Sequence, residues 1–261
     1  MIPHNQNLET SIRSRLNTRF VGQQLYYYPT LTSTMDTARN AAKEGAAEGT
    51  VVIANTQTAG RGRLGRTWLS PEGSLSMSLI LKPSLNNLPQ LIMIASLAVV
   101  RAIREVSGLE TQIKWPNDVL IKGKKVCGIL IENEVRGDRV DFTIIGIGIN
   151  VNFNPSAFPE ISEIATSLSQ ELGKEVSKAE FTTTLLFELE KLYLKTQFGA
   201  PICKEWRDHM ETLGRWIQVK TGNTIEQGKA EDVTENGNLL LRRADGSLTE
   251  IAAGDVTVTK D

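Results

Sequence analysis

The chain has 261 residues, 40% of them hydrophobic, and its formal net charge of −1 gives no overall attraction to nucleic acid or to a membrane surface. Its two cysteines and two histidines argue against a disulfide framework, a zinc motif, a His-dependent metal site and a Ser-His-Asp triad. We recognise no signal peptide, and the longest apolar run, 91–100, is too short to span a bilayer, so we predict a cytoplasmic protein.

Hydrophobic periodicity and turn residues predict most of the secondary structure. We expect a first helix over 8–20 and a first strand over 25–28 that Pro29 stops. Further helices are predicted at 33–42, 88–106, 181–197 and 201–213, with a short helix within 161–172, and further strands at 50–54, 74–81, 125–132 and 140–150.

The start of the second predicted helix carries two hydroxyl residues, Ser33 and Thr34. Ser33 and Asp36 have the spacing of a capping box, which indicates a helix start. The hydroxyls either cap this helix or bind a ligand at its start. The spacing does not decide between the two.

The segment 57–68, here called the Gly/Arg loop, interleaves three glycines with three arginines. Glycine allows a close approach of the backbone to a ligand, and arginine offers a planar fork of donors to carboxylate and phosphate. We therefore interpret the segment as a loop that closes over an anion, in preference to a solvated basic loop. We also expect it to be mobile without ligand, because it is rich in glycine and its arginines repel one another when no anion is bound.

Two phosphate-binding patterns fit the Gly/Arg loop by spacing, but their structural context is absent. The dinucleotide fingerprint and the phosphate-loop pattern both require a strand directly before and a helix directly after. The predicted strand 50–54 ends several residues before the loop, and the alternating segment 74–81 follows it as a strand. We therefore predict no helix N-terminus for phosphate binding there.

The segment 113–121 does not read as an ordinary strand, because Pro116 should interrupt its ladder and turn Asn117 and Asp118 outward. One interpretation is a plain turn. The other places a carboxylate and Lys114 beside a bound nucleotide, where the carboxylate can hold Mg²⁺.

Two glycine-containing strands follow. Lys125 begins the first, in which Gly128 indicates a close approach of ligand or backbone, and a lysine in this place is usually an edge charge. In the second, glycines alternate with isoleucines over 145–150 and clear space along one face. We consider pairing of the strand 140–149 with its copy in a homodimer.

The character of the chain changes near Gly214. Asn236-Gly237 and Asp245-Gly246 are hairpin-turn dipeptides between short β-like runs. We predict two domains, a larger one over 1–213 and a small β-barrel over 214–261.

Taken together, these motifs resemble the biotin protein ligases. The resemblance covers the chain from about Leu25 on, and its motifs occur in the order that the family shows. The matching segments are 33–36, 57–68, 114–118, 125–130 and 146–150, followed by the terminal barrel. The family's bifunctional members carry an N-terminal DNA-binding domain, which we do not find, so we expect no DNA binding.

The resemblance implies an α+β fold: a mixed, mostly antiparallel sheet flanked by helices, as in class II aminoacyl-tRNA synthetases and biotin ligases, with a small C-terminal β-barrel. It implies an ATP-dependent, AMP-forming biotin–[acetyl-CoA-carboxylase] ligase. Biotin's carboxylate attacks the α-phosphate of Mg-ATP, and a lysine of a biotin carboxyl carrier domain then attacks the biotinyl-adenylate. The acceptor protein, the order of binding and the oligomeric state stay open, including a homodimer.

The resemblance also assigns site residues. Biotin binding is implied for Ser33, Thr34, Met35, Gln57, Gly60, Arg61, Gly62, Arg63, Lys125 and Gly128. ATP binding is implied for Arg61, Arg63, Arg66, Trp68, Lys114, Asn117, Asp118 and Asn150, with Asp118 a candidate Mg²⁺ ligand. Arg63 and Lys125 are the implied catalytic residues. The family's aromatic residue against adenine has no counterpart near Ile164 and Ala165, so the grip on adenine stays open.

Two alternatives belong to other functional classes. A lipoate or octanoate ligase shares the expected fold and adenylate chemistry but would favour a purely apolar acyl pocket over Ser33, Thr34 and Gln57. A non-catalytic binding module would follow if Arg63 and Lys125 lay out of reach of the ligand.

Overall fold

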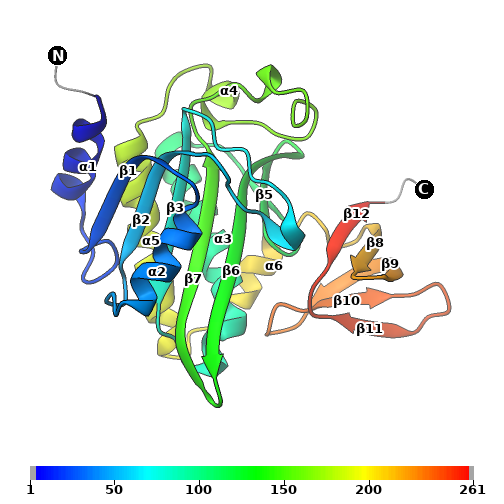
Figure 1. Cartoon of the computed structure of the whole chain (residues 1–261). Coiled ribbons are helices and arrows are strands. Elements are labelled where there is room, and N and C mark those ends of the chain that lie inside the picture. Colours follow the sequence, from blue (N-terminus) through cyan, green and yellow to red (C-terminus); the bar gives the residue numbers. More distant parts are fainter. Residues whose placement is uncertain (1–3, 259–261) are drawn as a thin grey trace.

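The computed structural model describes residues 4–258, and most of them are organised around one seven-stranded sheet (Figure 1). The strand order is β1-β2-β3-β7-β6-β5-β4. The strands are β1 Leu25–Leu31, β2 Val51–Gln57, β3 Ser74–Leu81, β4 Gln112–Lys114, β5 Asp118–Ile121, β6 Lys124–Arg136 and β7 Arg139–Asn150. β1 and β2 are parallel and the other neighbours are antiparallel, which confirms the predicted mixed sheet.

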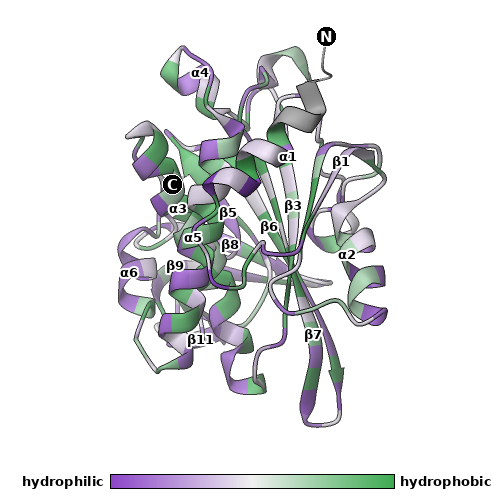
Figure 2. Cartoon of the chain, turned by 90° about the vertical axis from the view of Figure 1, so that its left-hand side faces the viewer, coloured by the Kyte–Doolittle hydropathy of each residue, from purple (hydrophilic) through white to green (hydrophobic). Residues whose placement is uncertain are grey.

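Helices cover both faces of this sheet (Figure 2). The longest are α3 Leu91–Ser107 and α5 Lys178–Gln197, which pack together on one face; α2 Thr34–Lys43 lies on the other. The shorter ones are α1 His4–Arg15, α4 Leu168–Leu172 and α6 Cys203–Asp208, with 3₁₀ turns η1 Arg63–Gly65, η2 Leu85–Gln90 and η3 Pro155–Ala157. None of the helices within residues 4–258 is long and apolar enough to cross a membrane.

Strand alternation divides the core into two apolar clusters. On β2, Ile53 points to the larger cluster under α3 and α5, while Val52 points to the smaller cluster under α2. Ile145 and Ile144 divide in the same way on β7. Both faces of the sheet are therefore buried, and the site described below lies on the α2 face.

The C-terminal strands form a second, five-stranded antiparallel sheet in the order β11-β10-β9-β8-β12. They are β8 Trp216–Thr221, β9 Thr224–Val233, β10 Leu239–Arg242, β11 Leu248–Ile251 and β12 Asp255–Val258. Gly237 and Gly246 turn the two predicted hairpins with φ of 78° and 83°. The Trp115 Nε1 donates to the Gly237 carbonyl at 2.9 Å, which joins this sheet to the larger one. The domain boundary at 213/214 stays a prediction.

The structure corrects the expected bounds of the first helix and strand. β1 continues through Pro29 to Leu31, because β1 is an edge strand whose outer side needs no donor. The first helix ends at Arg15 and not near residue 20. Beyond it, the backbone N–H groups of residues 19–21 donate to the Glu190 carboxylate, which replaces the helical hydrogen bonds there.

Three further expectations were wrong. β2 extends to Gln57 and leads directly into the Gly/Arg loop. The helix expected over 201–213 is reduced to α6, whereas the short helix expected within 161–172 is found as α4, which begins after Ser167, whose hydroxyl accepts from the Gln170 N–H. Pairing of β7 with a second copy is excluded over 143–150, because β3 and β6 occupy both of its edges there.

Candidate active site

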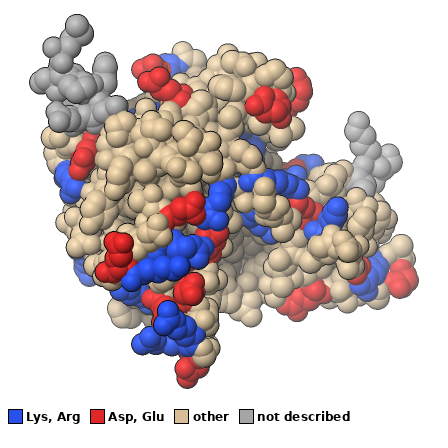
Figure 3. Space-filling view, viewed as in Figure 1, with Lys and Arg blue, Asp and Glu red and all other residues tan. Residues whose placement is uncertain are grey.

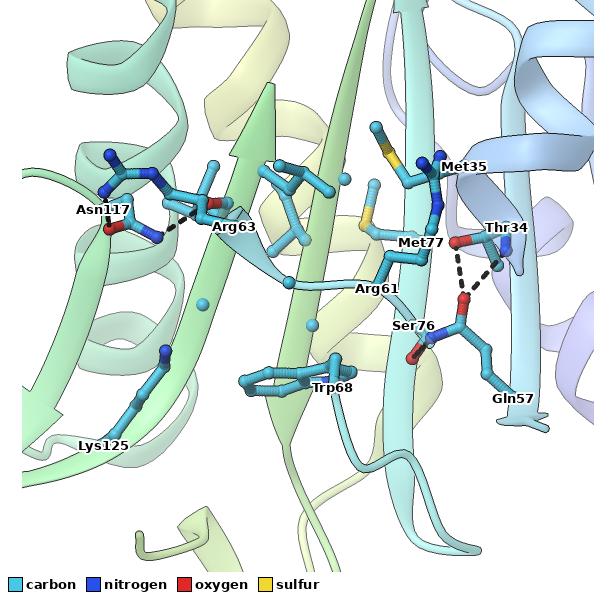
Figure 4. Close-up of a pocket in the computed structure, with 17 residues that line it drawn as sticks. Thr34, Met35, Gln57, Arg61, Arg63, Trp68, Ser76, Met77, Asn117 and Lys125 are labelled. Carbon is cyan, nitrogen blue, oxygen red and sulfur yellow. Dashed lines mark hydrogen bonds between the residues drawn. The ribbon is translucent and has the colours of Figure 1, made fainter. Parts of the chain in front are cut away.

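A cavity on the α2 face, here called the central cavity, lies over three glycines of β6 and β7. Gly128 pairs with Gly148 across the two strands, and Gly146 lies two residues before Gly148. A Cβ added at Gly148 would lie 2.4 Å from the Trp68 ring, and one at Gly146 would lie 2.5 Å from Met35 Sδ. The missing side chains therefore allow Trp68 and Met35 to lie against the sheet on either side of the cavity (Figure 4).

One end of the central cavity is polar. The Gln57 Oε1 accepts from the Thr34 backbone N–H at 2.8 Å and from its hydroxyl at 3.1 Å, and the Gln57 Nε2 donates to Ser76 Oγ at 3.1 Å (Figure 4). Ser78 Oγ donates to Thr34 Oγ1 at 2.9 Å. This end fixes an amide and several hydroxyls in defined orientations.

Ser33 does not cap α2, although it occupies the N-cap position. Its hydroxyl makes no cap hydrogen bond, is buried, and has no hydrogen-bond partner within the described residues. Buried polar groups normally have a partner. The structure thus decides against the capping alternative for Ser33. Ser33 is, however, not among the residues that line the central cavity.

The Gly/Arg loop crosses the central cavity and is fastened by its arginines. Arg61 pairs with Asp36 at 2.8 Å and with Glu132 at 3.1 Å. Arg63 donates to Asn117 Oδ1 at 2.8 Å (Figure 4). The loop leads into β3 and no helix opens after it, which confirms that the phosphate-loop patterns do not apply.

Lys125 faces the central cavity because β6 is irregular. The pairing of β5 with β6 passes from Val119↔Cys127 to Leu120↔Lys125 and skips Val126. A bulge of this kind re-aims the side chains that precede it. Lys125 therefore lies on the same face as Gly128, with its Nζ 5.4 Å from the Trp68 ring centroid and 2.7 Å from Asp118 Oδ1.

Residues 114–118 form a hairpin connection between β4 and β5 that contains a cis Trp115–Pro116 bond. Asn117 is oriented by β6, because its Nδ2 donates to the Ile129 carbonyl at 2.9 Å. Its Oδ1 consequently faces Arg63. Asn117 therefore lines the central cavity as a partner of Arg63.

A second cavity of about 570 Å³ adjoins the central one through Trp68 and Lys125. Its lining includes five of the residues that the resemblance assigns to ATP: Arg66, Trp68, Lys114, Asp118 and Asn150. Asn117 does not line it, nor do Arg61 and Arg63. Leu120, Ile161 and Ile164 give it an apolar wall.

Charge in the site is balanced by close partners, and basic and acidic side chains are interspersed on this face (Figure 3). Burial lowers the pKa of Arg63 from its ordinary value, while the carboxylates of Asp255 and Asp118 oppose that shift. Arg63 stays protonated, so a partly desolvated cation is available to an anion in the central cavity.

No cluster of three or more His, Cys, Asp or Glu that could hold a metal occurs within residues 4–258.

Sequence reasoning missed several residues at the site. Ser76 and Ser78 lie on the cavity side of β3, and their alternation with apolar residues was an available signal. Asp36 and Glu132, the partners of Arg61, lie far apart in the sequence, and no local pattern links them to the loop. Of the assigned biotin residues, Gly60 does not line the central cavity; a Cβ there would lie 2.4 Å from the Trp68 carbonyl oxygen.

Comparison with known proteins places the chain in a family. The model of the biotin/lipoate A/B protein ligase family matches residues 27–150, and the model of the biotin protein ligase C-terminal domain matches residues 212–258. The bifunctional ligase/repressor BirA of Bacillus subtilis is 44% identical over 95% of this chain and 78% of its own length. The biotin–[acetyl-CoA-carboxylase] ligase of Paracoccus denitrificans is 37% identical over 73% of this chain and 83% of its own length.

A solved structure supports the same conclusion. The biotin protein ligase of Aquifex aeolicus in complex with biotin and ATP superposes with a TM-score of 0.79 at 31% identity, covering 92% of this chain and all of that one. The two family models match the chain in consecutive segments, 27–150 and 212–258. The chain belongs to the biotin protein ligase family.

Proposed function

We propose that this ATP-dependent biotin–protein ligase forms biotinyl-5′-AMP across its two adjoining cavities and then passes biotin to a lysine of a carrier domain. The observation that carries this assignment is the continuity of the cavities. The central one is polar at one end, and Trp68 and Lys125 join its other end to the larger one. The comparisons do not favour the lipoate and binding-module alternatives.

The polar end of the central cavity suits the ureido ring of biotin. That ring presents N–H donors and a carbonyl acceptor, so its recognition requires oriented amide and hydroxyl groups of both kinds. Thr34 and Gln57 would supply them from the cavity wall, while Ser33, whose unpartnered hydroxyl does not line the cavity, stays a predicted biotin contact. The apolar part of the bicycle would lie between Met35 and Trp68, over Gly146 and Gly148.

Arg63 and Lys125 lie where the biotin carboxylate would meet the α-phosphate. In the first step, a carboxylate oxygen bonds to the α-phosphorus and the bond to pyrophosphate breaks. Two cations held by fixed partners stabilise the charge that develops, without reorganisation at the moment of reaction. The partners are Asn117 for Arg63 and Asp118 for Lys125.

In the second step, the neutral amine of the acceptor lysine attacks the acyl carbon, the bond to AMP breaks, and the amine loses a proton. Arg63 would stabilise the AMP phosphate as it departs. The same cation would thus serve both steps. The Paracoccus relative is named for acetyl-CoA carboxylase, so we propose the biotin carboxyl carrier domain of that enzyme as acceptor.

Mg²⁺ would accompany ATP into the second cavity. Mg²⁺ is commonly held by one or two protein carboxylates together with substrate phosphates and water. Asp118 lines that cavity, which fits this donor set, although its carboxylate also pairs with Lys125. The ion would neutralise the triphosphate, and Lys114 and Arg66 would contribute further positive charge.

A cytoplasmic location, the absence of DNA binding and a homodimer stay predictions. Both cysteines are buried and unpaired, which is consistent with a reducing compartment. The direct test of the proposed function is pyrophosphate release from ATP with the purified chain. We expect release to depend on biotin and not on lipoate or octanoate; lipoate-dependent release, or none with biotin, would reject the assignment.

A further inference from the structure

The C-terminal sheet reaches the Gly/Arg loop through the residues that begin β12. The Arg66 guanidinium forms a hydrogen-bonded ion pair with the Asp255 carboxylate, and Arg63 donates to the Gly254 carbonyl at 3.4 Å. Two of the three loop arginines therefore contact adjacent residues of the other sheet. We propose that Asp255 is a positioning residue that holds the tip of the Gly/Arg loop over the active site.

Apart from the hydrogen bond of Arg63 to Asn117, the loop tip has little else to hold it. None of the residues of η1, 63–65, is buried. Leu64 has a φ of 55°, in the left-handed region that a residue with a side chain rarely adopts, and it is 68% exposed. Burial of apolar surface thus contributes little to the tip, and the contacts of its arginines determine where it lies.

Asp255, in contrast, is well anchored. It pairs with Lys220 of β8 as the first residue of β12. Thr221 Oγ1 donates to the Ala253 carbonyl at 2.6 Å, and a Cβ at Gly254 would lie 2.5 Å from Val219 Cγ1. The segment 253–255 therefore lies tightly against β8, and its carboxylate and carbonyl are presented to the loop from a fixed strand.

The pair leaves Arg66 able to bind substrate. A guanidinium has several N–H donors, one side chain can serve a carboxylate and a phosphate together, and Arg66 is 67% exposed. Arg66 also lines the second cavity. Asp255 would therefore orient Arg66 toward ATP. This inference rests on the ATP-binding role that we propose for Arg66.

The test compares Asp255→Asn with Glu231→Gln. Both remove one negative charge from the C-terminal sheet, but the partner of Glu231 is Arg242 of the neighbouring strand and not an arginine of the loop. We expect Asp255→Asn to raise the rate of tryptic cleavage after Arg61, Arg63 or Arg66, and the KM for ATP, by about two- to fivefold, the range of an exposed ion pair. Glu231→Gln should change neither, and Asp255→Glu should restore part of both.

Two features of the result identify a positioning role. The KM for biotin should change less than the KM for ATP in Asp255→Asn, because Arg63 keeps its hydrogen bond to Asn117, and the difference from the wild type should shrink at high salt because the pair is exposed. If Asp255→Asn matches Glu231→Gln in both loop cleavage and KM for ATP, the inference is overturned. Loop cleavage needs no turnover, so it reports on Asp255 even if the wild-type chain releases no pyrophosphate, an outcome that would reject the proposed function instead.

Discussion

Replacement of Lys125 by alanine tests the proposed chemistry most directly. The Lys125 Nζ lies 2.7 Å from Asp118 Oδ1 and 5.4 Å from the Trp68 ring centroid, between the two cavities. A hydrogen bond to a charged group contributes about 1.5–3 kcal/mol, so losing it in the transition state corresponds to roughly 10- to 100-fold in rate. The substitution also leaves the Asp118 carboxylate unpaired beside the triphosphate, which acts in the same direction. We expect kcat for adenylation to fall by that factor, with a smaller rise in the KM for ATP.

The assay is the initial rate of pyrophosphate release at saturating biotin and ATP. Lys124→Ala is the matched control, since it removes the same charge one residue away and Lys124 does not line either cavity. It should be close to the wild type. Damage by Lys124→Ala in place of Lys125→Ala would refute the strand geometry described here, and wild-type rates for both variants would make Lys125 an edge charge without a part in catalysis.

Three further substitutions test separate parts of the site, and a fourth tests a buried carboxylate of α5. Arg63→Ala should accelerate dissociation of biotinyl-adenylate by roughly 10- to 100-fold, through loss of a charge-assisted hydrogen bond, as measured by filter binding; unchanged retention would contradict its proposed role. Gln57→Ala should mainly raise the KM for biotin, while an effect confined to the KM for ATP would place Gln57 elsewhere. Gly148→Ala should weaken biotin binding in calorimetry, because the new methyl would displace the Trp68 ring; unaltered affinity would show that the ring does not bound the biotin site. Burial raises the pKa of Glu188, but hydrogen bonds from Lys191 and Arg101 lower it by more. The pKa of Glu188 therefore lies below its ordinary value. This stabilisation is present above the ordinary carboxyl pKa and is lost as pH falls through the lowered one, so Glu188→Gln should cost about 1–2 kcal/mol in urea unfolding at pH 7 and progressively less as the pH is lowered below the ordinary carboxyl pKa; a difference independent of pH would contradict it.

Much of the sheet was predictable because its strands carry strong local patterns. The strand expected over 74–81 was found with those bounds. Its residues alternate in character because its two sides face different layers of the fold. The continuation of β1 through Pro29 was not predictable in this way. It depends on β1 lying at the edge of the sheet, which is a property of the assembled fold and not of the local sequence.

The orientation of Lys125 shows that regular strand alternation does not by itself predict which side chains face the site. Regular alternation counted back from Gly128 would turn Lys124, and not Lys125, toward the glycine face. The bulge at Val126 reverses this choice. Only the family resemblance pointed to the lysine that lines the cavity, because a bulge leaves no clear signal in the residues around it.

The contacts that fasten the Gly/Arg loop also lay beyond local pattern. Its residue types indicated an anion-binding loop, but its partners come from α2, β6 and β12, which lie before and far after it in the sequence. Contacts of this kind depend on the packing of both sheets. The loop's composition therefore indicated its chemistry but did not indicate which residues hold the loop in place.

These partners change the physical argument for loop motion. Repulsion among the arginines is offset by the carboxylates paired with Arg61 and Arg66 and by the amide bound to Arg63, so repulsion alone does not mobilise the loop. The central cavity has a volume of about 50 Å³, whereas ligand sites commonly measure a few hundred or more, so the loop and Trp68 must shift to admit biotin. Opening must then break exposed ion pairs, each worth little, and the carboxylate and phosphates of the substrates can offer the same arginines stronger partners. Loop closure over substrate is thus best described as an exchange of partners at Arg61 and Arg63, while Arg66 keeps Asp255 and adds a phosphate.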